Sequence, residues 1–100
     1  MHKLLVLYPE PVDRDAFERH YRETHLALCE KLPGVVEIGF SLGLAEGPYY
    51  AVFEASFADG AALSRALGSP EGAAVQADVP NYATGGAVVL TFPQEQLALA

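Results

Sequence analysis

The stretch from Asp13 to Gly34 constrains the fold most, because it predicts one amphipathic helix against which the other segments must pack. At about 100° per residue its apolar side chains fall on one stripe, while its charged side chains point into water. Asp13 or Asp15 can cap the start of this helix, and Pro33 prevents it from continuing. The predicted stripe consists of Phe17, Tyr21, Thr24, Leu28 and Leu32, with His25 at its edge.

The other segments read as a small α+β domain. The predicted strands are residues 2–8, 35–44, 49–57 and 87–92. Residues 59–78 form a second helical region with a break near Gly68, and residues 80–86 are predicted to be a loop. The order β-α-β-β-α-β is the ferredoxin-like split pattern, an antiparallel four-stranded sheet with both helical segments on one face. Residues 1–100 are predicted to form a single domain, since a chain this short has no room for two cores.

The first and the last predicted strands lack a polar side. Residues 2–8 and 87–92 are apolar on both faces, which is typical of strands that are covered on both sides. Helices on one face leave the other face of the sheet open. A symmetric homodimer would cover the open faces, because the same patch then serves both partners. We therefore expect a homodimer with sheet facing sheet, a dimeric α+β barrel.

Charge and cysteine content exclude several classes of function. The formal net charge is −7 and only six residues are Lys or Arg, which argues against nucleic acid and against an anionic membrane surface as partners. No apolar run approaches the ~18 residues of a spanning helix. The lone cysteine, Cys29, cannot form a disulfide within the chain. A reduced, cytoplasmic setting is the simplest expectation.

The spacing of residues in the first predicted helix resembles the sequence pattern of a known family. Phe17, Tyr21 and His25 follow one another at steps of four, and Leu32-Pro33-Gly34-Val35 ends the helix. With Pro80-Asn81-Tyr82 before the last strand, they resemble the EthD family of the dimeric α+β barrel superfamily. Two positions differ from the family pattern: His20 stands where members often carry a bulky aromatic residue, and Tyr82 replaces a common phenylalanine.

The resemblance implies a homodimeric barrel with a cavity between each sheet and its own helices. It also implies small organic ligands, because many relatives in the superfamily act on such molecules. Some of these relatives are monooxygenases that use no cofactor, some are isomerases of ring lactones, and others handle haem.

His25 and Tyr21 are the candidate catalytic residues. An imidazole titrates near neutral pH, so His25 at the edge of a cavity could take a proton from an enolic or phenolic substrate. The alternative is a histidine that bonds a backbone carbonyl between helix and sheet. Tyr21 could hold a substrate oxygen or orient the imidazole, and its alternative is a core tyrosine with its tip in water.

Four further residues are candidates for substrate binding. Asn81 and Tyr82 precede the last strand, where loop residues could reach the mouth of a cavity, although Asn also favours turns for local reasons. Tyr8 lies at the end of the first strand, and Phe17 lies on the helix stripe. Cys29 follows His25 by one turn, but its place near the helix C-terminus disfavours a thiolate. It is interpreted as a small apolar filler.

No metal site is expected. His20 and His25 are five residues apart, which on an α-helix places them ~140° apart, whereas the helical metal motif needs a spacing of four. No carboxylate lies one or two turns from either histidine on the correct face. No cofactor is expected, and haem ligation by His25 stays open only through the resemblance.

Three functions remain open. The first is a small cofactor-free monooxygenase or isomerase with His25 as general base. The second is a non-catalytic dimer that holds a small ligand or serves an oxidative degradation pathway. A third reading, an assembly element without a ligand, needs no cavity at all.

Overall fold

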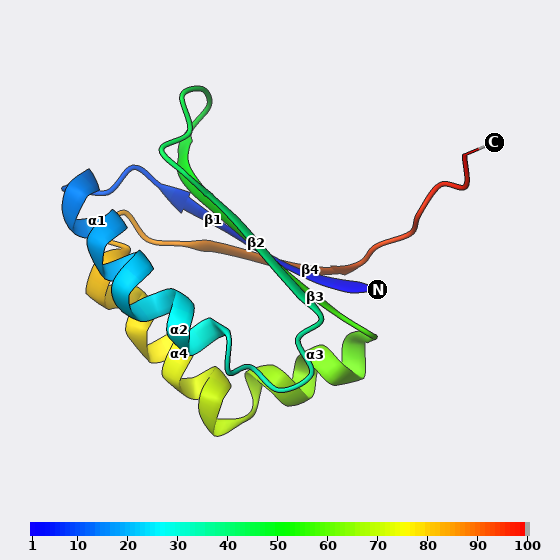
Figure 1. Cartoon of the computed structure of the whole chain (residues 1–100). Coiled ribbons are helices and arrows are strands. Elements are labelled where there is room, and N and C mark those ends of the chain that lie inside the picture. Colours follow the sequence, from blue (N-terminus) through cyan, green and yellow to red (C-terminus); the bar gives the residue numbers. More distant parts are fainter. Residues whose placement is uncertain (100) are drawn as a thin grey trace.

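The computed structural model describes residues 1–99, so Ala100, which ends the predicted domain, lies outside the described residues. The strands are β1 (His2–Pro9), β2 (Glu37–Leu42), β3 (Tyr49–Phe57) and β4 (Val88–Pro93). The helices are α1 (Arg14–His20), the π-helical segment η1 (Tyr21–His25), α2 (Leu26–Cys29), α3 (Gly60–Leu67) and α4 (Pro70–Tyr82). The antiparallel sheet has the order β2-β3-β1-β4, with the helices on one face (Figure 1). The predicted ferredoxin-like α+β fold is confirmed.

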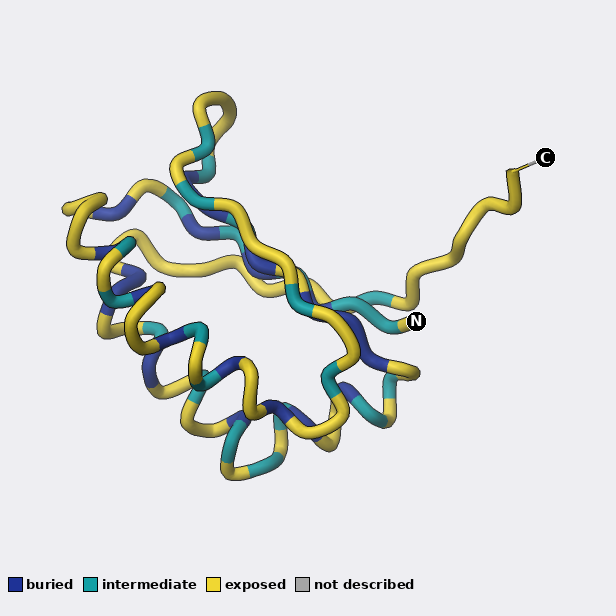
Figure 2. The backbone as a smooth tube through the Cα atoms, in the orientation of Figure 1, coloured by how far each residue is buried: buried dark blue, intermediate teal, exposed yellow. Residues whose placement is uncertain are grey.

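The sheet takes its register from its apolar alternation. Val6 of β1 pairs with Phe53 of β3 and with Val89 of β4, so these side chains share the face under the helices. Leu4, Val6 and Tyr8 are buried on that face. Buried positions alternate with partly buried ones along β1 (Figure 2). Within residues 1–99 no helix is long and apolar enough to span a bilayer.

Side-chain caps begin each of the three main helical segments. Asp13 accepts a hydrogen bond from the Ala16 N–H (3.1 Å), and Asp59 accepts one from the Ala62 N–H (2.8 Å). Ser69 does the same for α4, with Pro70 at the first helical position. These bonds satisfy backbone donors that have no partner inside a helix, and they confirm the predicted helix starts.

The first helix contains a wide turn that its sequence pattern did not predict. The Leu26 N–H bonds to the carbonyl of Tyr21, five residues earlier, and residues 21–25 are π-helical. An α-helix completes one turn every 3.6 residues. Side chains spaced four residues apart therefore move gradually off one face of the helix, unless one turn contains more residues. Thr24 is exposed, so its predicted place on the inner stripe is wrong, and His25 is buried there instead. The buried side chains are Phe17, Tyr21, His25, Cys29 and Leu32.

The last helix runs further than predicted. Residues 80–82 belong to α4, so the prediction of a loop beginning at Pro80 is wrong. Pro80 lacks the N–H that would continue the helical bonding, but Tyr82 is buried in the core. The Ala83 N–H closes the last turn on the carbonyl of Val79. Burial of the Tyr82 ring therefore outweighs the local break.

Tyr50 departs from the predicted alternation of its strand. The pairing of β1 with β3 shifts between Tyr8 and Pro9, which pair with Ala51 and Tyr49, so Tyr50 is the extra residue of a bulge. Its ring packs on Phe17 with centroids 4.9 Å apart. Alternation predicts Tyr50 on the face opposite Ala51, whereas the bulge turns it toward the helices.

Gly72 lies where α3 meets α4, and its position leaves no space for a side chain. A Cβ there would overlap the Ala66 carbonyl oxygen and lie 2.7 Å from that of Leu67. The two helices approach each other closely because this position carries only a hydrogen.

Replacement of Gly72 by alanine should therefore destabilise the fold by about 1–3 kcal/mol, the usual cost of overpacking. The measurement is the free energy of unfolding in urea. Ala73→Ser, on the exposed next residue of the same helix, should change it by less than about 0.5 kcal/mol. Equal values for both variants would contradict the close approach.

Candidate active site

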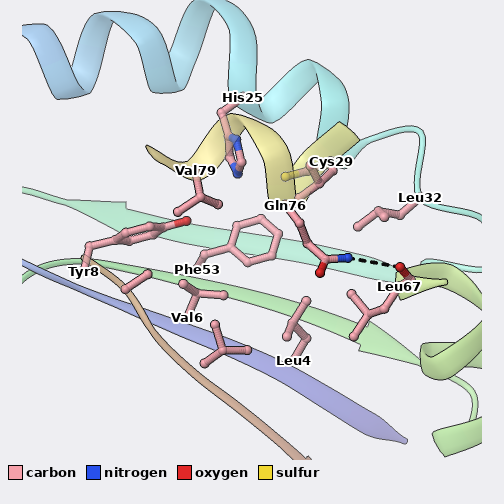
Figure 3. A pocket seen from close by; sticks show the side chains of 13 residues that line it. Leu4, Val6, Tyr8, His25, Cys29, Leu32, Phe53, Leu67, Gln76 and Val79 are labelled. Atoms are coloured by element: carbon pink, nitrogen blue, oxygen red, sulfur yellow. Dashed lines mark hydrogen bonds between the residues drawn. The ribbon is translucent and has the colours of Figure 1, made fainter. Parts of the chain in front are cut away.

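The cavity of interest lies between the sheet and the two helices that cross it. It has a volume of about 150 Å³, and α4 packs against α1, η1 and α2 at its side. Figure 3 shows the His25 ring reaching into this space from the first helix, with Val6 and Phe53 of the sheet facing it. The lining residues are Leu4, Val6, Tyr8, His25, Cys29, Leu32, Phe53, Leu67, Val75, Gln76, Val79, Ala87 and Val89.

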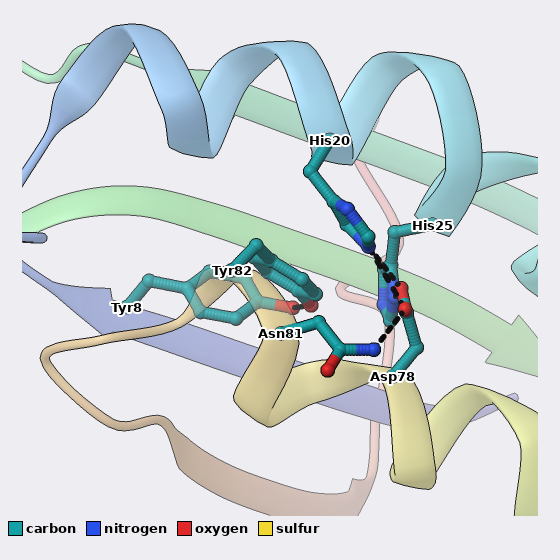
Figure 4. A network of polar contacts seen from close by, with 6 residues as sticks. All are labelled: Tyr8, His20, His25, Asp78, Asn81 and Tyr82. Carbon is teal, nitrogen blue, oxygen red and sulfur yellow. Dashed lines mark hydrogen bonds and ion pairs between the residues drawn. The ribbon is translucent and has the colours of Figure 1, made fainter.

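A buried carboxylate, Asp78 of α4, lies at the centre of the polar contacts (Figure 4). Its Oδ2 accepts a hydrogen bond from Nδ1 of His25 (2.9 Å), and both its oxygens accept from Nε2 of His20 (2.8 and 3.0 Å). Asn81 Nδ2, one turn on, donates to Oδ1 at 2.9 Å. Asp78 is only 7% exposed, so these donors replace the water that an ionised carboxylate needs.

These bonds determine the state of His25. A carboxylate only accepts, so Nδ1 carries the proton and Nε2 keeps its lone pair in the neutral ring. Burial lowers the pKa of His25 below its ordinary value, although Asp78 opposes this. Burial raises the pKa of Asp78, but the bonds from Asn81, His20 and His25 outweigh it and hold that pKa below the ordinary value. At neutral pH the pair is a neutral imidazole beside a carboxylate.

The π-helical turn brings His20 and His25 to the same carboxylate. The predicted divergence of ~140° holds for an ideal α-helix and is wrong for this segment. Residues five apart come onto one face when the backbone bonds skip five residues. The carboxylate was missing from the prediction because it comes from α4, 53 residues after His25.

Tyr8 and Tyr82 form the second polar feature. Their hydroxyls share a hydrogen bond of 2.7 Å. Burial raises the pKa of Tyr8 to about 12 and also raises that of Tyr82, so both hydroxyls stay protonated at neutral pH. The Tyr82 ring lies 4.6 Å from the His25 ring and 5.6 Å from that of Tyr8, between centroids. Tyr8 and His25 both line the cavity.

The other predicted site residues lie beside the cavity, outside its lining. Tyr21 stacks on His25 with centroids 5.4 Å apart, and its buried hydroxyl has no hydrogen-bond partner within residues 1–99. Phe17 packs against Tyr21 and Tyr82. Asn81 contacts the site through the carboxylate of Asp78. The structure thus brings Tyr8 and His25 to the cavity and places the rest around them.

Cys29 lines the cavity as a buried thiol. Burial raises its pKa to about 12, so it is protonated at neutral pH, in keeping with the apolar filler of the sequence analysis. Among residues 1–99 no group of three His, Cys, Asp or Glu side chains is arranged to hold a metal ion.

Haem does not fit the residues present. A cavity of about 150 Å³ accommodates a molecule about as large as benzene, whereas a porphyrin carries four pyrrole rings around its iron. No step is assigned to haem.

Asp78 is the residue of the candidate site that sequence reasoning missed. Val75, Val79 and Tyr82 form an inward stripe at helical spacing, and Asp78 lies on it. A carboxylate on an apolar helix face needs a buried partner. That signal was present, but it could not name His25 as the partner.

Known sequences and structures resemble the chain over most of its length. The sequence model of the EthD domain matches residues 9–86. An uncharacterized 11.0 kDa protein from the thcB-thcC intergenic region of Rhodococcus erythropolis is 32% identical over 105 residues, covering 99% of each chain. An EthD family protein from Bacillus halodurans C-125 is 29% identical, covers 95% of this chain and 99% of its own, and superposes with a TM-score of 0.87.

Two more distant structures share the fold alone. One is a dimeric ferredoxin-like protein of unknown function from Thermobifida fusca YX, with 21% identity over 93% of this chain and 90% of its own, at a TM-score of 0.70. The other is a mutant of SnoaB, a cofactor-independent oxygenase from Streptomyces nogalater. It has 19% identity over 96% of this chain and 94% of its own, at a TM-score of 0.65.

The tautomer of His25 can be measured directly. At pH 7 the ¹⁵N spectrum of the imidazole side chains should show His25 protonated at Nδ1 and unprotonated at Nε2, because Asp78 accepts from Nδ1. In Asp78→Ala this preference should disappear. A proton on Nε2 of His25 in the unmodified protein would contradict the geometry.

Proposed function

Because the chain belongs to the EthD domain family, we propose that it is a small-molecule enzyme in which His25 acts as a general base. One observation carries this proposal: the His25 ring borders an apolar cavity while a buried carboxylate holds its Nδ1–H. This is the arrangement of a base with an orienting group. Asp78 is the orienting residue.

The proposed reaction begins with removal of a proton from a carbon or oxygen acid. Nε2 of His25 takes the proton, and the resulting imidazolium lies beside the carboxylate of Asp78, which stabilises its charge. The substrate is left with a negative oxygen. Tyr8, whose hydroxyl stays protonated, donates a hydrogen bond to that oxygen, and Tyr82 supports Tyr8 through their shared bond.

The anion can continue in two ways. As a monooxygenase, the protein would let the anion react with O₂, so that a CH₂ group becomes C=O while the second oxygen atom leaves as water. The substrate then supplies the electrons and no cofactor is required. The fold shared with a cofactor-independent oxygenase supports this course. As an isomerase, the protein would return the proton to a different carbon, with the protonated His25 as the acid.

A binding function is the second candidate. The cavity walls are mostly aliphatic and aromatic side chains, which would retain an apolar molecule without reacting with it. In that case the protein would deliver or sequester a small ligand for an oxidative pathway. His25 would then affect affinity alone.

We also propose that two copies pair through the open face of the sheet. Leu5 and Leu7 of β1 lie opposite Leu90 and Val88 of β4 on that face, and Leu90 is 46% exposed. A patch of this kind is costly in water and serves both partners of a symmetric dimer. The dimeric ferredoxin-like protein from Thermobifida fusca supports this proposal by its fold.

The base is tested by hydrogen exchange at carbon. Cyclohexanone in D₂O should exchange the hydrogens beside its carbonyl faster with the protein, as followed by proton NMR. His25→Ala should reduce this catalysed rate by about 10²–10⁴-fold. His20→Ala is the matched control, because it also loses a bond to Asp78 but does not line the cavity. It should reduce the rate by less than about tenfold.

The pH profile adds a check that does not depend on a variant. Since His25 works as a base only when neutral and its pKa lies below the ordinary 6.5, the rate should be level at pH 7 and fall at lower pH. A rate that instead rises as pH falls would reject His25 as the base. Affinity without exchange would favour the binding function.

The dimer is tested by a charge on the open face. Leu90→Asp should shift the sedimenting species from dimer to monomer, because each copy would bring a carboxylate into an apolar contact. Ala61→Asp, on an exposed position of α3, should leave the dimer intact. A monomer for the unmodified protein at micromolar concentration would exclude this assembly.

A further inference from the structure

The side chains that line the cavity are apolar except at a few positions. Most lining side chains are aliphatic or aromatic. Tyr8 and His25 supply a hydroxyl and an imidazole, and the Tyr82 ring contacts both of them. Gln76 is the remaining polar lining residue, and its Nε2 already donates to the carbonyls of Leu67 and Gly72 at 3.0 Å. Apart from Gln76, the site therefore offers one hydroxyl and one base to a ligand, beside an apolar body.

The cavity carries no charge that could bind an ionic ligand. Among the described residues that line it, none is Lys, Arg, Asp or Glu. The thiol of Cys29 and the hydroxyl of Tyr8 are protonated at neutral pH, since burial raises both pKa values to about 12. The nearest carboxylate, Asp78, already accepts from His20, His25 and Asn81. A carboxylate, phosphate or ammonium ligand would lose its hydration there without gaining an oppositely charged partner.

The volume of the cavity and the position of its opening also limit which ligands can bind. A cavity of about 150 Å³ holds a molecule the size of benzene, so one six-membered ring fills it. Its opening follows the edge strand β4, because Val89 lines the cavity and is nevertheless 57% exposed. Val89 lies on the helix-facing side of the sheet, opposite Val6, so this opening is separate from the open face proposed for the dimer.

We propose that the site takes an uncharged molecule of about one six-membered ring, with a single carbonyl or hydroxyl oxygen directed at Tyr8. The ring lies among Val6, Phe53 and Val79, and the hydrogen beside the oxygen-bearing carbon faces Nε2 of His25. This inference rests on the proposed function for the role of His25, but the choice of ligand follows from the walls alone. It separates this chain from proteins that act on acids, phosphate esters or fused ring systems.

The experiment compares four probes that share a six-membered carbon ring. Cyclohexanone is the neutral single ring, cyclohexanecarboxylate and cyclohexylammonium carry opposite charges on the same ring, and 1-decalone adds a fused second ring. Binding is measured by titration of ¹H–¹⁵N spectra of the full-length protein at pH 7. Cyclohexanone should bind at least about tenfold more tightly than each charged probe and more tightly than 1-decalone. Its shifts should centre on Val6, Val75 and Val79.

Several results would overturn the proposal. These are equal or tighter binding of a charged probe, tighter binding of 1-decalone, and no binding of cyclohexanone at millimolar concentration. Val75→Phe, which fills the cavity, should weaken cyclohexanone binding at least about tenfold, while Val12→Phe on an exposed loop should not. Leu67→Phe fills the same cavity from α3, if Val75→Phe does not fold.

The two proposals fail in different ways. If cyclohexanone binds with the expected selectivity but exchanges no hydrogen, the ligand class holds and the catalytic role of His25 fails. If exchange is catalysed while a charged ring binds best, the base holds and the ligand class fails. Binding and exchange are read from the same protein and the same probe.

Discussion

The carboxylate of Asp78 is the constraint on which the site depends. A buried negative charge is strongly destabilising unless hydrogen-bond donors surround it. Here the donors come from two helices: His20 and His25 from the first, and Asn81 from the same helix as Asp78. The carboxylate therefore ties α4 to the first helix and gives His25 its tautomer. Stability and the proposed chemistry rest on the same four groups.

The π-helical turn follows from this constraint. π-Helical turns are rare in proteins, and those that occur are often found at functional sites. This one places His20 and His25, five residues apart, over one carboxylate. The turn also keeps Phe17, Tyr21 and His25 on one buried face. A regular α-helix would direct one imidazole away and leave the carboxylate short of a donor. The bonds to Asp78 compensate for the irregular backbone.

The cavity exists because the two ends of the interface between helices and sheet are filled differently. At one end, aromatic rings pack together: Phe17 lies edge to face with Tyr8 and with Tyr82, and the rings of Tyr8 and Tyr82 are tilted against each other. At the other end the short side chains of Val6 and Val79 do not span the gap between sheet and α4. His25 lies between these two ends of the interface. Its ring is hydrogen-bonded on the side of the packed aromatic rings and borders the cavity on the other side.

The sequence by itself determined the kinds and order of the elements. Hydrophobic alternation, the cap at Asp13 and the break near Gly68 depend on a few neighbouring residues, so local patterns in the sequence reveal them. Sequence reasoning also named His25, on the stripe edge of the first helix, and Tyr8, at the end of the first strand, and both line the cavity. The tertiary structure alone decided the partner of His25, the wide turn, the bulge at Tyr50 and the helical state of residues 80–82. Each of these depends on a contact between segments far apart in the chain, and such contacts override the local preference of the backbone.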